Sequence, residues 1–274
     1  MMAAVTVSPS VVEHSRPRGL LSHSTFIAGR WLRAQLRQPL YIVFTLVQPA
    51  IWLLLFGQLF KNLAQLPGFG GGSYISYLTP GIVIMTALMG AGWSGSNFIT
   101  DIDRGIMDRM LTSPVRRGAL MIGQLVSQSA ATVVQAVIVV LIGLLAGASY
   151  AGGVLGLLVT VLMGVLLGAA FASLSNAVAL LARKQESLIA ISQFVSLPLT
   201  FLSSVMMAPA LMPSWLASVS KFNPVDWAVV ASREALSASP DWSVVLTRGG
   251  LLLAFALVIG WLSTRAFAAY QRSA

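Results

Sequence analysis

The feature that most limits the fold of this chain is a series of long stretches without a charged side chain. Residues 38–60, 62–100 and 118–182 contain no Asp, Glu, Lys or Arg, and about 20 apolar residues in a helix suffice to cross the hydrocarbon core of a membrane. Only 9% of the 274 residues are charged, and the mean hydropathy is +0.83. Soluble domains carry roughly 25% charged residues. The sequence therefore predicts an all-α integral membrane protein.

The uncharged stretches, divided at their loops, predict six transmembrane helices. A Gly-rich segment at 67–73 separates the first two helices, and a turn at 148–153 divides the longest stretch. Residues 1–21, rich in Ser, Pro and Val, are expected to form a flexible cytoplasmic tail without a cleaved signal peptide. A single transmembrane domain then covers residues 22–274. The predicted spans are 40–60, 76–99, 119–147, 154–182, 188–208 and 244–265.

The positive charges alternate between the two sides of this frame. Thirteen of the 17 Lys and Arg residues fall on the side of the N-terminus, three fall on the other side and Arg248 lies at the boundary. Because cytoplasmic loops are enriched in Lys and Arg, both termini are expected in the cytoplasm, which requires an even number of spans. The Arg residues flank apolar runs, so the net charge of +9 indicates membrane orientation and no nucleic-acid partner.

Small side chains recur at every fourth position in two predicted spans. Such ridges let helix backbones approach closely in lipid, either within one subunit or between subunits. The residues are Ala87, Ala91 and Gly95 in the second span, and Gly164, Gly168 and Ala172, followed by Asn176, in the fourth.

Residues 24–38 predict an amphipathic helix on the inner membrane surface. At 100° per residue, Arg30, Arg33 and Arg37 fall within one narrow arc, and apolar residues such as Trp31 and Leu36 cover the other side. The basic arc would face anionic headgroups. A simple membrane anchor and a regulatory element are both compatible with this pattern.

Residues 101–117 predict a second amphipathic helix, on the cytoplasmic side. Its apolar face includes Ile106 and Met110, and Ser113-Pro114 is typical of the start of the next helix. A simple connecting loop would not need a helix of mixed charge, so this one offers a rigid surface for another protein. A solvated loop is the alternative. The polar face consists of Asp101, Arg104, Asp108 and Arg109.

Residues 208–236 predict two short helices on the outer side, which would cap the outer end of a pathway. Trp215 begins an apolar series at helical spacing, Asn223-Pro224 breaks it, and a second helix carries Arg233. Irregular backbone at this depth must be buried in protein or line a watery space. An interfacial aromatic anchor is the alternative, because Trp favours the membrane interface.

Several kinds of chemistry are excluded by residue type. The chain has no cysteine, and its two histidines, His14 and His23, lie in the tail, so no catalytic residue and no metal site is predicted. No charge lies at the centre of a span, which argues against a carrier coupled to protons or sodium. The lysines lack a phosphate-binding G-x-x-x-x-G-K pattern. If ATP drives the protein, a separate subunit binds it.

Two of these segments together resemble the type-2 permease family of ABC exporters, especially the daunorubicin-resistance-like permeases. The cytoplasmic stretch RGIMDRMLTSPVRRGALMIGQL resembles that family's pattern of Gly, an acidic residue, Leu, Ser or Thr, Pro and basic residues. The outer stretch MPSWLASVSKFNPVDWAVVASREAL resembles its Pro-Trp-Leu, Asn-Pro and closing Arg. The likeness runs from about Phe26 to Phe267. Asp108 departs from it, since Glu is more usual there, which puts a direct salt bridge to a partner in doubt.

The resemblance implies an assembly in which two permeases, identical or homologous, pair with two cytoplasmic ATPase subunits. ATP and Mg would bind to the ATPases, and the permease itself would hold no cofactor and have no enzyme activity. Residues 101–112 would be the coupling helix, and the outer segment would be a re-entrant hairpin between helices five and six. The coupling residues would be Asp101, Arg104, Gly105, Ile106, Asp108, Arg109 and Met110.

Helices one, two and five would line the transport path in this family. Four polar residues on them, Gln48, Gln58, Asn97 and Gln193, are candidates for substrate contact or for ordinary hydrogen bonds between helices. The hairpin candidates are Trp215, Asn223, Pro224 and Arg233.

The resulting expectation is a multi-pass permease of a bacterial inner membrane that exports hydrophobic or amphipathic compounds such as drugs, antibiotics or lipids. Two alternatives remain: export of a lipid-linked saccharide, and a membrane scaffold that transports nothing. A saccharide path would favour exposed aromatic rings, and among the tryptophans only Trp52 and Trp93 lie well inside predicted spans.

Replacing Arg30, Arg33 and Arg37 with Gln is expected to lower membrane insertion or stability without abolishing ATPase docking, because each basic residue near an anionic surface contributes about 1 kcal/mol. Fractionation and expression measurements check this. A triple variant indistinguishable from the wild type in both would contradict the surface-helix interpretation.

Overall fold

The computed structural model describes residues 29, 33, 39–62, 73–106 and 117–273, and within these residues it contains helices and no strand. The elements before the fifth span are α2 (Pro39–Leu59), α3 (Tyr74–Gly92), α4 (Ser96–Asp103), α6 (Arg117–Leu145) and α7 (Gly153–Ala182). Those that follow are α8 (Gln185–Phe201), the 3-10 turn η2 (Pro209–Leu211), α9 (Ser214–Ser220), α10 (Pro224–Leu236) and α11 (Trp242–Ser273).

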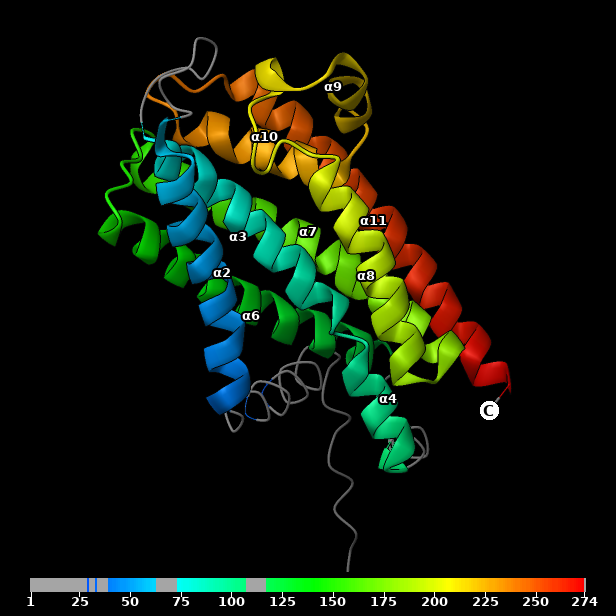
Figure 1. Cartoon of the computed structure of the whole chain (residues 1–274). Helices are drawn as coiled ribbons and strands as arrows, with labels where there is room; N and C mark the ends of the chain where they lie inside the picture. The colour runs from blue at the N-terminus through cyan, green and yellow to red at the C-terminus, as the bar shows by residue number, and fades with distance from the viewer. Residues whose placement is uncertain (1–28, 30–32, 34–38, 63–72, 107–116, 274) are drawn as a thin grey trace, which may run out of the picture.

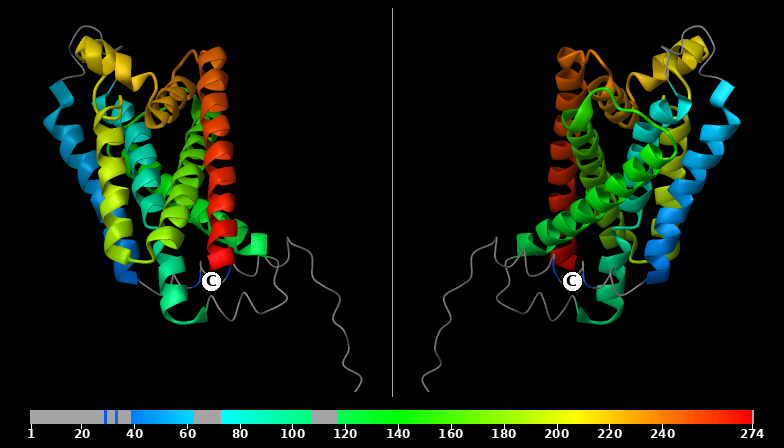
Figure 2. Two further views of the ribbon diagram at one scale, coloured as in Figure 1. Left: turned by 90° about the vertical axis from the view of Figure 1, so that its right-hand side faces the viewer. Right: turned by 90° about the vertical axis from the view of Figure 1, so that its left-hand side faces the viewer.

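The helices form a bundle with distinct ends (Figure 1). Helix α7 packs against α3, α6, α10 and α11, and α3 in turn contacts α2 and α8. Helices α9 and α10 cover one end of the bundle, which we call the hairpin end, and α4 projects from the opposite end (Figures 1 and 2). The first residues of α2 and the last residues of α11 lie at the α4 end (Figure 2).

Four helical stretches, one of them interrupted between α3 and α4, are long and apolar enough to cross a membrane. They are Tyr74–Asp103, Met121–Leu145, Gly153–Ala182 and Trp242–Arg265. Helix α2, of 21 residues, has a shorter apolar part at Leu46–Leu59, and α8 has 17 residues. The predicted all-helical membrane fold is therefore confirmed, and four of the six predicted spans meet this criterion within the described residues.

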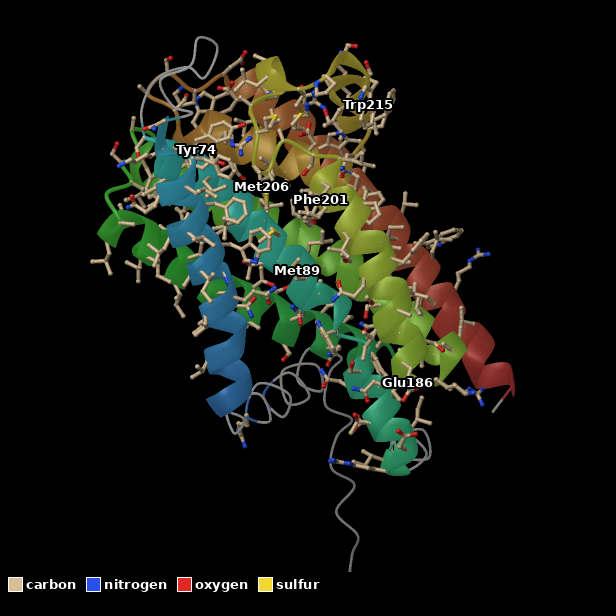
Figure 3. The ribbon with its side chains drawn as sticks, viewed as in Figure 1. Tyr74, Met89, Glu186, Phe201, Met206 and Trp215 are labelled. Carbon is tan, nitrogen blue, oxygen red and sulfur yellow. The ribbon has the colours of Figure 1, made fainter. Side chains whose placement is uncertain are left out.

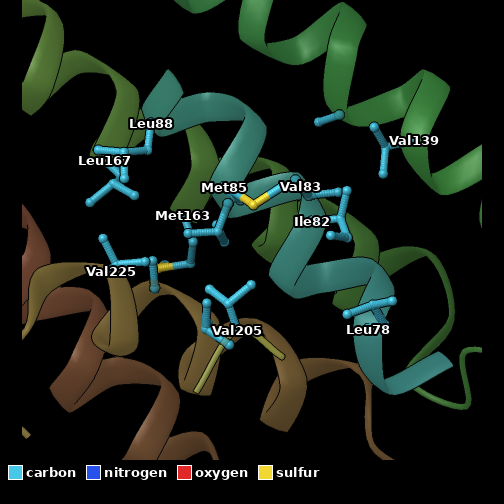
Figure 4. Packing of buried hydrophobic residues seen from close by; sticks show 14 of the residues in the cluster. Leu78, Ile82, Val83, Met85, Leu88, Val139, Met163, Leu167, Val205 and Val225 are labelled. Carbon is cyan, nitrogen blue, oxygen red and sulfur yellow. The ribbon is translucent and has the colours of Figure 1, made fainter. Parts of the chain in front are cut away.

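The most buried stretch is the one that contains α3. Within its most apolar window 72% of residues are buried, against 17% for α11. Leu78, Ile82 and Leu88 are fully enclosed, and Figure 4 shows α3 side chains packed against Leu167 of α7 and Val205. The second predicted span is thus the centre of the protein core, while most of α11 is exposed on the outside of the bundle.

The small-residue ridges pack against each other inside this one chain. A Cβ atom built on Gly164 would lie 3.7 Å from Val83 and 3.8 Å from Ala87, and one on Gly168 would lie 3.7 Å from the carbonyl oxygen of Ala87. Helices α3 and α7 approach closely because these positions are small. The interpretation as internal packing is confirmed.

Three predicted helix boundaries are wrong. The second span, predicted as one helix at 76–99, is interrupted between α3 and α4. The fifth, predicted to reach residue 208, ends at Phe201. The cytoplasmic helix predicted at 101–112 is not continuous, because α4 ends at Asp103 and Gly105 adopts a φ of 65°, a left-handed conformation that ends helices. Ile106 is helical again, and residues 107–116 lie outside the described residues.

The close approach of α3 and α7 predicts a graded response at Gly164. Gly164→Ala should change the free energy of unfolding by no more than about 0.5 kcal/mol, since a Cβ meets only ordinary van der Waals contacts there. Gly164→Leu should lose about 1–3 kcal/mol by overpacking. Thermal unfolding in detergent measures both.

Gly250→Leu on α11 is the matched control, because a Cβ there meets nothing within 4 Å. Equal loss of stability in the two Leu variants would contradict the packing described for α3 and α7.

Candidate functional site

The break in the second span is the first of two places where helical backbone is interrupted inside the bundle. Between α3 and α4, the N–H of Ser96 bonds to the carbonyl of Trp93, which leaves the Gly92 carbonyl and the Gly95 N–H without backbone partners. Such groups are costly in a membrane protein unless side chains satisfy them. We call residues 93–95 the α3–α4 break.

Side chains from three helices satisfy the break. The Ser175 hydroxyl of α7 donates to the Gly92 carbonyl (2.7 Å) and accepts from the Gly95 N–H (3.0 Å). Ser192 of α8 donates to the same Gly92 carbonyl (3.0 Å), and Gln124 of α6 donates to the Ser94 carbonyl (3.1 Å). The break is therefore a built feature of the bundle, held by α6, α7 and α8 together.

Glycine is required at position 95 for steric reasons. A Cβ there would lie 2.5 Å from the Ser175 carbonyl oxygen and 2.8 Å from the Ala179 Cβ. Helix α4 then leads out of the bundle with Phe98, Ile99 and Asp101 buried. The break thus joins the buried core helix directly to the segment predicted to contact another protein (Figure 1).

The second interruption lies at the hairpin end, where the chain is not helical from Leu202 to Ala208. Arg233 of α10 holds this segment. Its Nη1 donates to the Ser204 carbonyl (2.6 Å), its Nη2 to the Val205 carbonyl (2.7 Å) and its Nε to the Tyr77 carbonyl of α3 (3.1 Å). The guanidinium also lies 3.5 Å from the centre of the Tyr77 ring. One planar fork thus ties α10, α3 and the unwound segment together.

Two further residues, Asp226 and Asn223, also hold this segment. Together with Arg233 they form what we call the hairpin clamp. Asp226 accepts a bond from the Ser204 N–H (2.8 Å). Asn223 donates to the carbonyls of Leu199 (2.7 Å) and Leu202 (3.0 Å), and its side-chain oxygen caps α10 at Val225. The predicted role of Asn223-Pro224 as a helix break is confirmed, and the same Asn also closes the end of α8.

The electrostatics of the clamp rest on one enclosed cation. Burial lowers the pKa of Arg233 from its ordinary value, and the neighbouring Tyr77 and Asp226 counteract that shift. Within the described residues no carboxylate lies in ion-pair range of Arg233. Carbonyl oxygens and an aromatic face therefore stabilise the charge in place of a salt bridge.

The predicted coupling residues lie only partly within the described structure. Asp101 is 5% exposed on α4, Arg104 follows the helix end, and Gly105 makes the turn before Ile106. Asp108, Arg109 and Met110 lie outside the described residues. The predicted polar face thus begins with a carboxylate that is buried within this chain.

The predicted path residues do not form one cluster. Gln48 and Gln58 are exposed on α2, roughly 15 Å apart along the helix axis. Asn97 lies on α4 just beyond the break, and Gln193 is exposed on α8. Gln48 lines a small cavity of about 80 Å³ between α2, α3 and α6, whose wall also contains Thr86 and Gln135.

A larger apolar cavity of about 260 Å³ lies between α2, the start of α3, the end of α8 and the segment that leads to α9. Phe56, Phe60, Tyr74, Phe201 and Met206 line it, and Figure 3 labels the last three of these. The rings continue one another along α2 and α3, with centroids 5.5 Å apart for Phe56 and Phe60 and 6.0 Å for Phe60 and Tyr74. This surface suits apolar or aromatic groups.

The structure describes Trp215 and only one of the three arginines predicted to lie at the membrane surface. Trp215 on α9 is 61% exposed, as expected of an interfacial aromatic residue. Arg33 is helical and exposed, whereas Arg30 and Arg37 lie outside the described residues.

Sequence reasoning missed Ser175, Ser192, Gln124 and Asp226, which hold the two interruptions. Ser and Gln within apolar helices resemble ordinary packing residues, and their partners are 22 to 100 positions away. The Trp93–Gly95 sequence, with its Ser-Gly pair, was the available indication of a break.

Comparison with known proteins identifies the family of this chain. The family described as ABC-2 type transporter matches residues 24–237. The chain belongs to the ABC-2 type transporter family. This permease is 28% identical over 275 residues to the daunorubicin resistance ABC transporter permease protein DrrB1 of Streptomyces coeruleorubidus, covering 92% of this chain and 95% of that protein. The predicted likeness to daunorubicin-resistance permeases is confirmed.

Two further relatives are similarly distant in sequence. The putative transport permease ycf38 of Pyropia yezoensis is 28% identical over 76% of this chain and 71% of its own length, and that of Cyanophora paradoxa is 29% identical over 78% and 74%. The ABC-2 permease is thus a multi-pass membrane protein and a permease subunit of an ABC transporter, which implies an ATPase partner.

The clamp predicts that Arg233→Lys destabilises the ABC-2 permease. A lysine has one nitrogen in place of the planar fork and leaves enclosed carbonyls unpaired, so the free energy of unfolding should fall by about 2 kcal/mol or more. Arg248→Lys is the control, since Arg248 makes a single 3.4 Å contact to the Lys221 carbonyl. Thermal unfolding checks both, and equal losses would contradict the clamp.

Proposed function

We propose that this permease exports hydrophobic or amphipathic compounds, with ATP hydrolysis supplied by a separate subunit. In this assembly two permeases, identical or homologous, pair with two cytoplasmic ATPases that bind ATP and Mg, and the permease itself holds no cofactor. The name of the Streptomyces coeruleorubidus relative, with daunorubicin resistance in it, supports outward movement of such compounds.

The proposed topology has six spans in a bacterial inner membrane with both termini in the cytoplasm. The start of α2, the end of α11 and α4 lie at the same end of the bundle, which supports this orientation (Figure 2). The excess of Lys and Arg on that side agrees with it. Helices α2 and α8 complete the six, with the non-helical segment 202–208 extending the fifth span toward the hairpin end.

The observation that carries the proposal is the α3–α4 break. A force applied at the cytoplasmic segment 101–112 reaches α4 first, and α4 joins the most buried helix through a three-residue interruption. Short element-terminal segments of this kind absorb the dihedral changes of hinge motions. In this proposal α4 pivots at residues 93–95 when the ATPase moves.

The apolar cavity supports the proposed substrate class. It lies between α2 and α8, the first and fifth spans, and its walls are aromatic rings, methionines and a few hydroxyls. Aromatic and Met side chains bind varied apolar shapes. None of Gln48, Gln58, Asn97 and Gln193 lines this cavity, and each would add a single polar contact elsewhere on the route.

The two alternative functions remain distinguishable from this one. A saccharide exporter would be stimulated by polyhydroxylated rather than apolar compounds. A scaffold that transports nothing would not need ATPase coupling.

Met110→Asp is expected to uncouple the permease. Loss of a buried apolar anchor at an interface costs about 2 kcal/mol or more, which weakens docking roughly thirtyfold. The variant should insert and pair but lose ATPase co-purification, export and substrate-stimulated ATP hydrolysis. Gly105→Trp should act in the same direction, because it forces a bulky residue into the left-handed conformation.

Arg116→Gln, nearer the membrane, is the control and should retain most docking and export. Full docking and export by the Met110→Asp variant would show that residues 101–112 are not the coupling element.

A further inference from the structure

A second and larger cavity, of about 630 Å³, lies at the hairpin end between the start of α3, the loop from α6 to α7 and α10. It shares no lining residue with the apolar cavity between α2 and α8. Its volume is in the range of about 300–1,000 Å³ that small-molecule sites occupy. Its polar residues are Ser73, Ser76, Tyr77, Ser149, Tyr150, Ser204, Arg233, Glu234 and Ser237.

The cavity wall contains accessible hydroxyls with unused hydrogen-bonding capacity. The Ser73 hydroxyl accepts from the Ile75 N–H (3.3 Å) and the Ser76 hydroxyl accepts from the Ser149 N–H (2.9 Å), so both protons remain available to a further acceptor. Ser73 and Ser149 are exposed, and Ser76 is partly exposed. These groups favour a polar occupant.

The charges at the cavity favour an occupant without net charge. Arg233 has each of its three nitrogens on a carbonyl oxygen, so it is already engaged by the protein. The next residue, Glu234, makes no side-chain hydrogen bond or ion pair within the described part of the chain, and it lines the same cavity. An anionic ligand would meet Glu234 and a cationic ligand would meet Arg233. A carboxylate, in contrast, accepts bonds from two neighbouring hydroxyls.

We propose that this cavity binds a neutral polyhydroxylated group of one or two sugar units, as a free saccharide or as the headgroup of a glycolipid. Glu234 accepts hydroxyl protons, and Ser73, Ser76 and Ser149 exchange hydrogen bonds with the remaining hydroxyls. This binding is separate from export and does not require the apolar cavity.

The test uses the full-length permease in phosphatidylcholine nanodiscs prepared without sugar detergents. Saturation-transfer NMR with maltose as the probe should show contact, and Glu234→Gln should weaken binding at least tenfold. Ala151→Trp, at an exposed lining position, should abolish it by filling the cavity. Val154→Trp is the control, since Val154 is 73% exposed and does not line the cavity.

A second arm separates the two sources of the sugar. Glucosyl diacylglycerol in the nanodisc should displace maltose if the ligand is a lipid headgroup, and should leave the maltose signal unchanged if it is a free saccharide. The proposal is overturned if neither maltose nor the glycolipid binds, if phosphoethanolamine binds in their place, or if the Ala151→Trp variant binds maltose as tightly as the wild type.

Discussion

The rest of the structure depends on how backbone polar groups are paired where a helix is interrupted within a lipid-embedded bundle. Lipid offers no hydrogen bonds, so each freed carbonyl or N–H must find a partner in the protein. Here the interruptions lie at the two ends of the most buried helix region. Ser175, Ser192 and Gln124 hold the α3–α4 break, and Arg233 leads the clamp over segment 202–208.

These two polar arrangements connect elements that are distant in sequence. The break ties α3 to α6, α7 and α8, and the clamp ties α3 to α10 and to the end of α8. Helix α3 is therefore fixed at both ends, while α4 extends beyond the break toward the cytoplasmic segment. Close packing between the small residues of α3 and α7 keeps the hydroxyls within bonding distance. This combination gives a rigid core with one defined place for movement.

The sequence predicted the architecture well because composition and charge-free length are direct consequences of the membrane as solvent. The helical segments around α6 and α7, and α9 and α10 of the hairpin, appeared within a few residues of their predicted bounds. The break at Trp93–Gly95 and the early end of α8 at Phe201 were not predicted. Both depend on tertiary partners. At the break, Ser175 bonds the Gly95 N–H that has lost its helical partner, and at the end of α8, Asn223 bonds the Leu199 carbonyl. The local sequence, a Ser-Gly pair in one case and Pro198 in the other, does not show that these distant partners are present. Arg233 was selected from a family likeness, and its three carbonyl partners could be found only from the fold.

The central claim is that α4 pivots at the α3–α4 break when the ATPase acts. The chain contains no cysteine, so spin labels can be placed at introduced cysteines replacing Asp103 on α4 and Leu181 on α7, both exposed. The sample is the complete complex with a cysteine-free ATPase, diluted with unlabelled permease so that pairs within one subunit are measured. Pulsed electron–electron double resonance should show that the distance between the two labels changes by about 2 Å or more between the nucleotide-free and ATP-trapped states. The distance between labels in a control pair at Leu181 and Leu257 should not change. Identical Asp103–Leu181 distances in the two states would contradict the pivot.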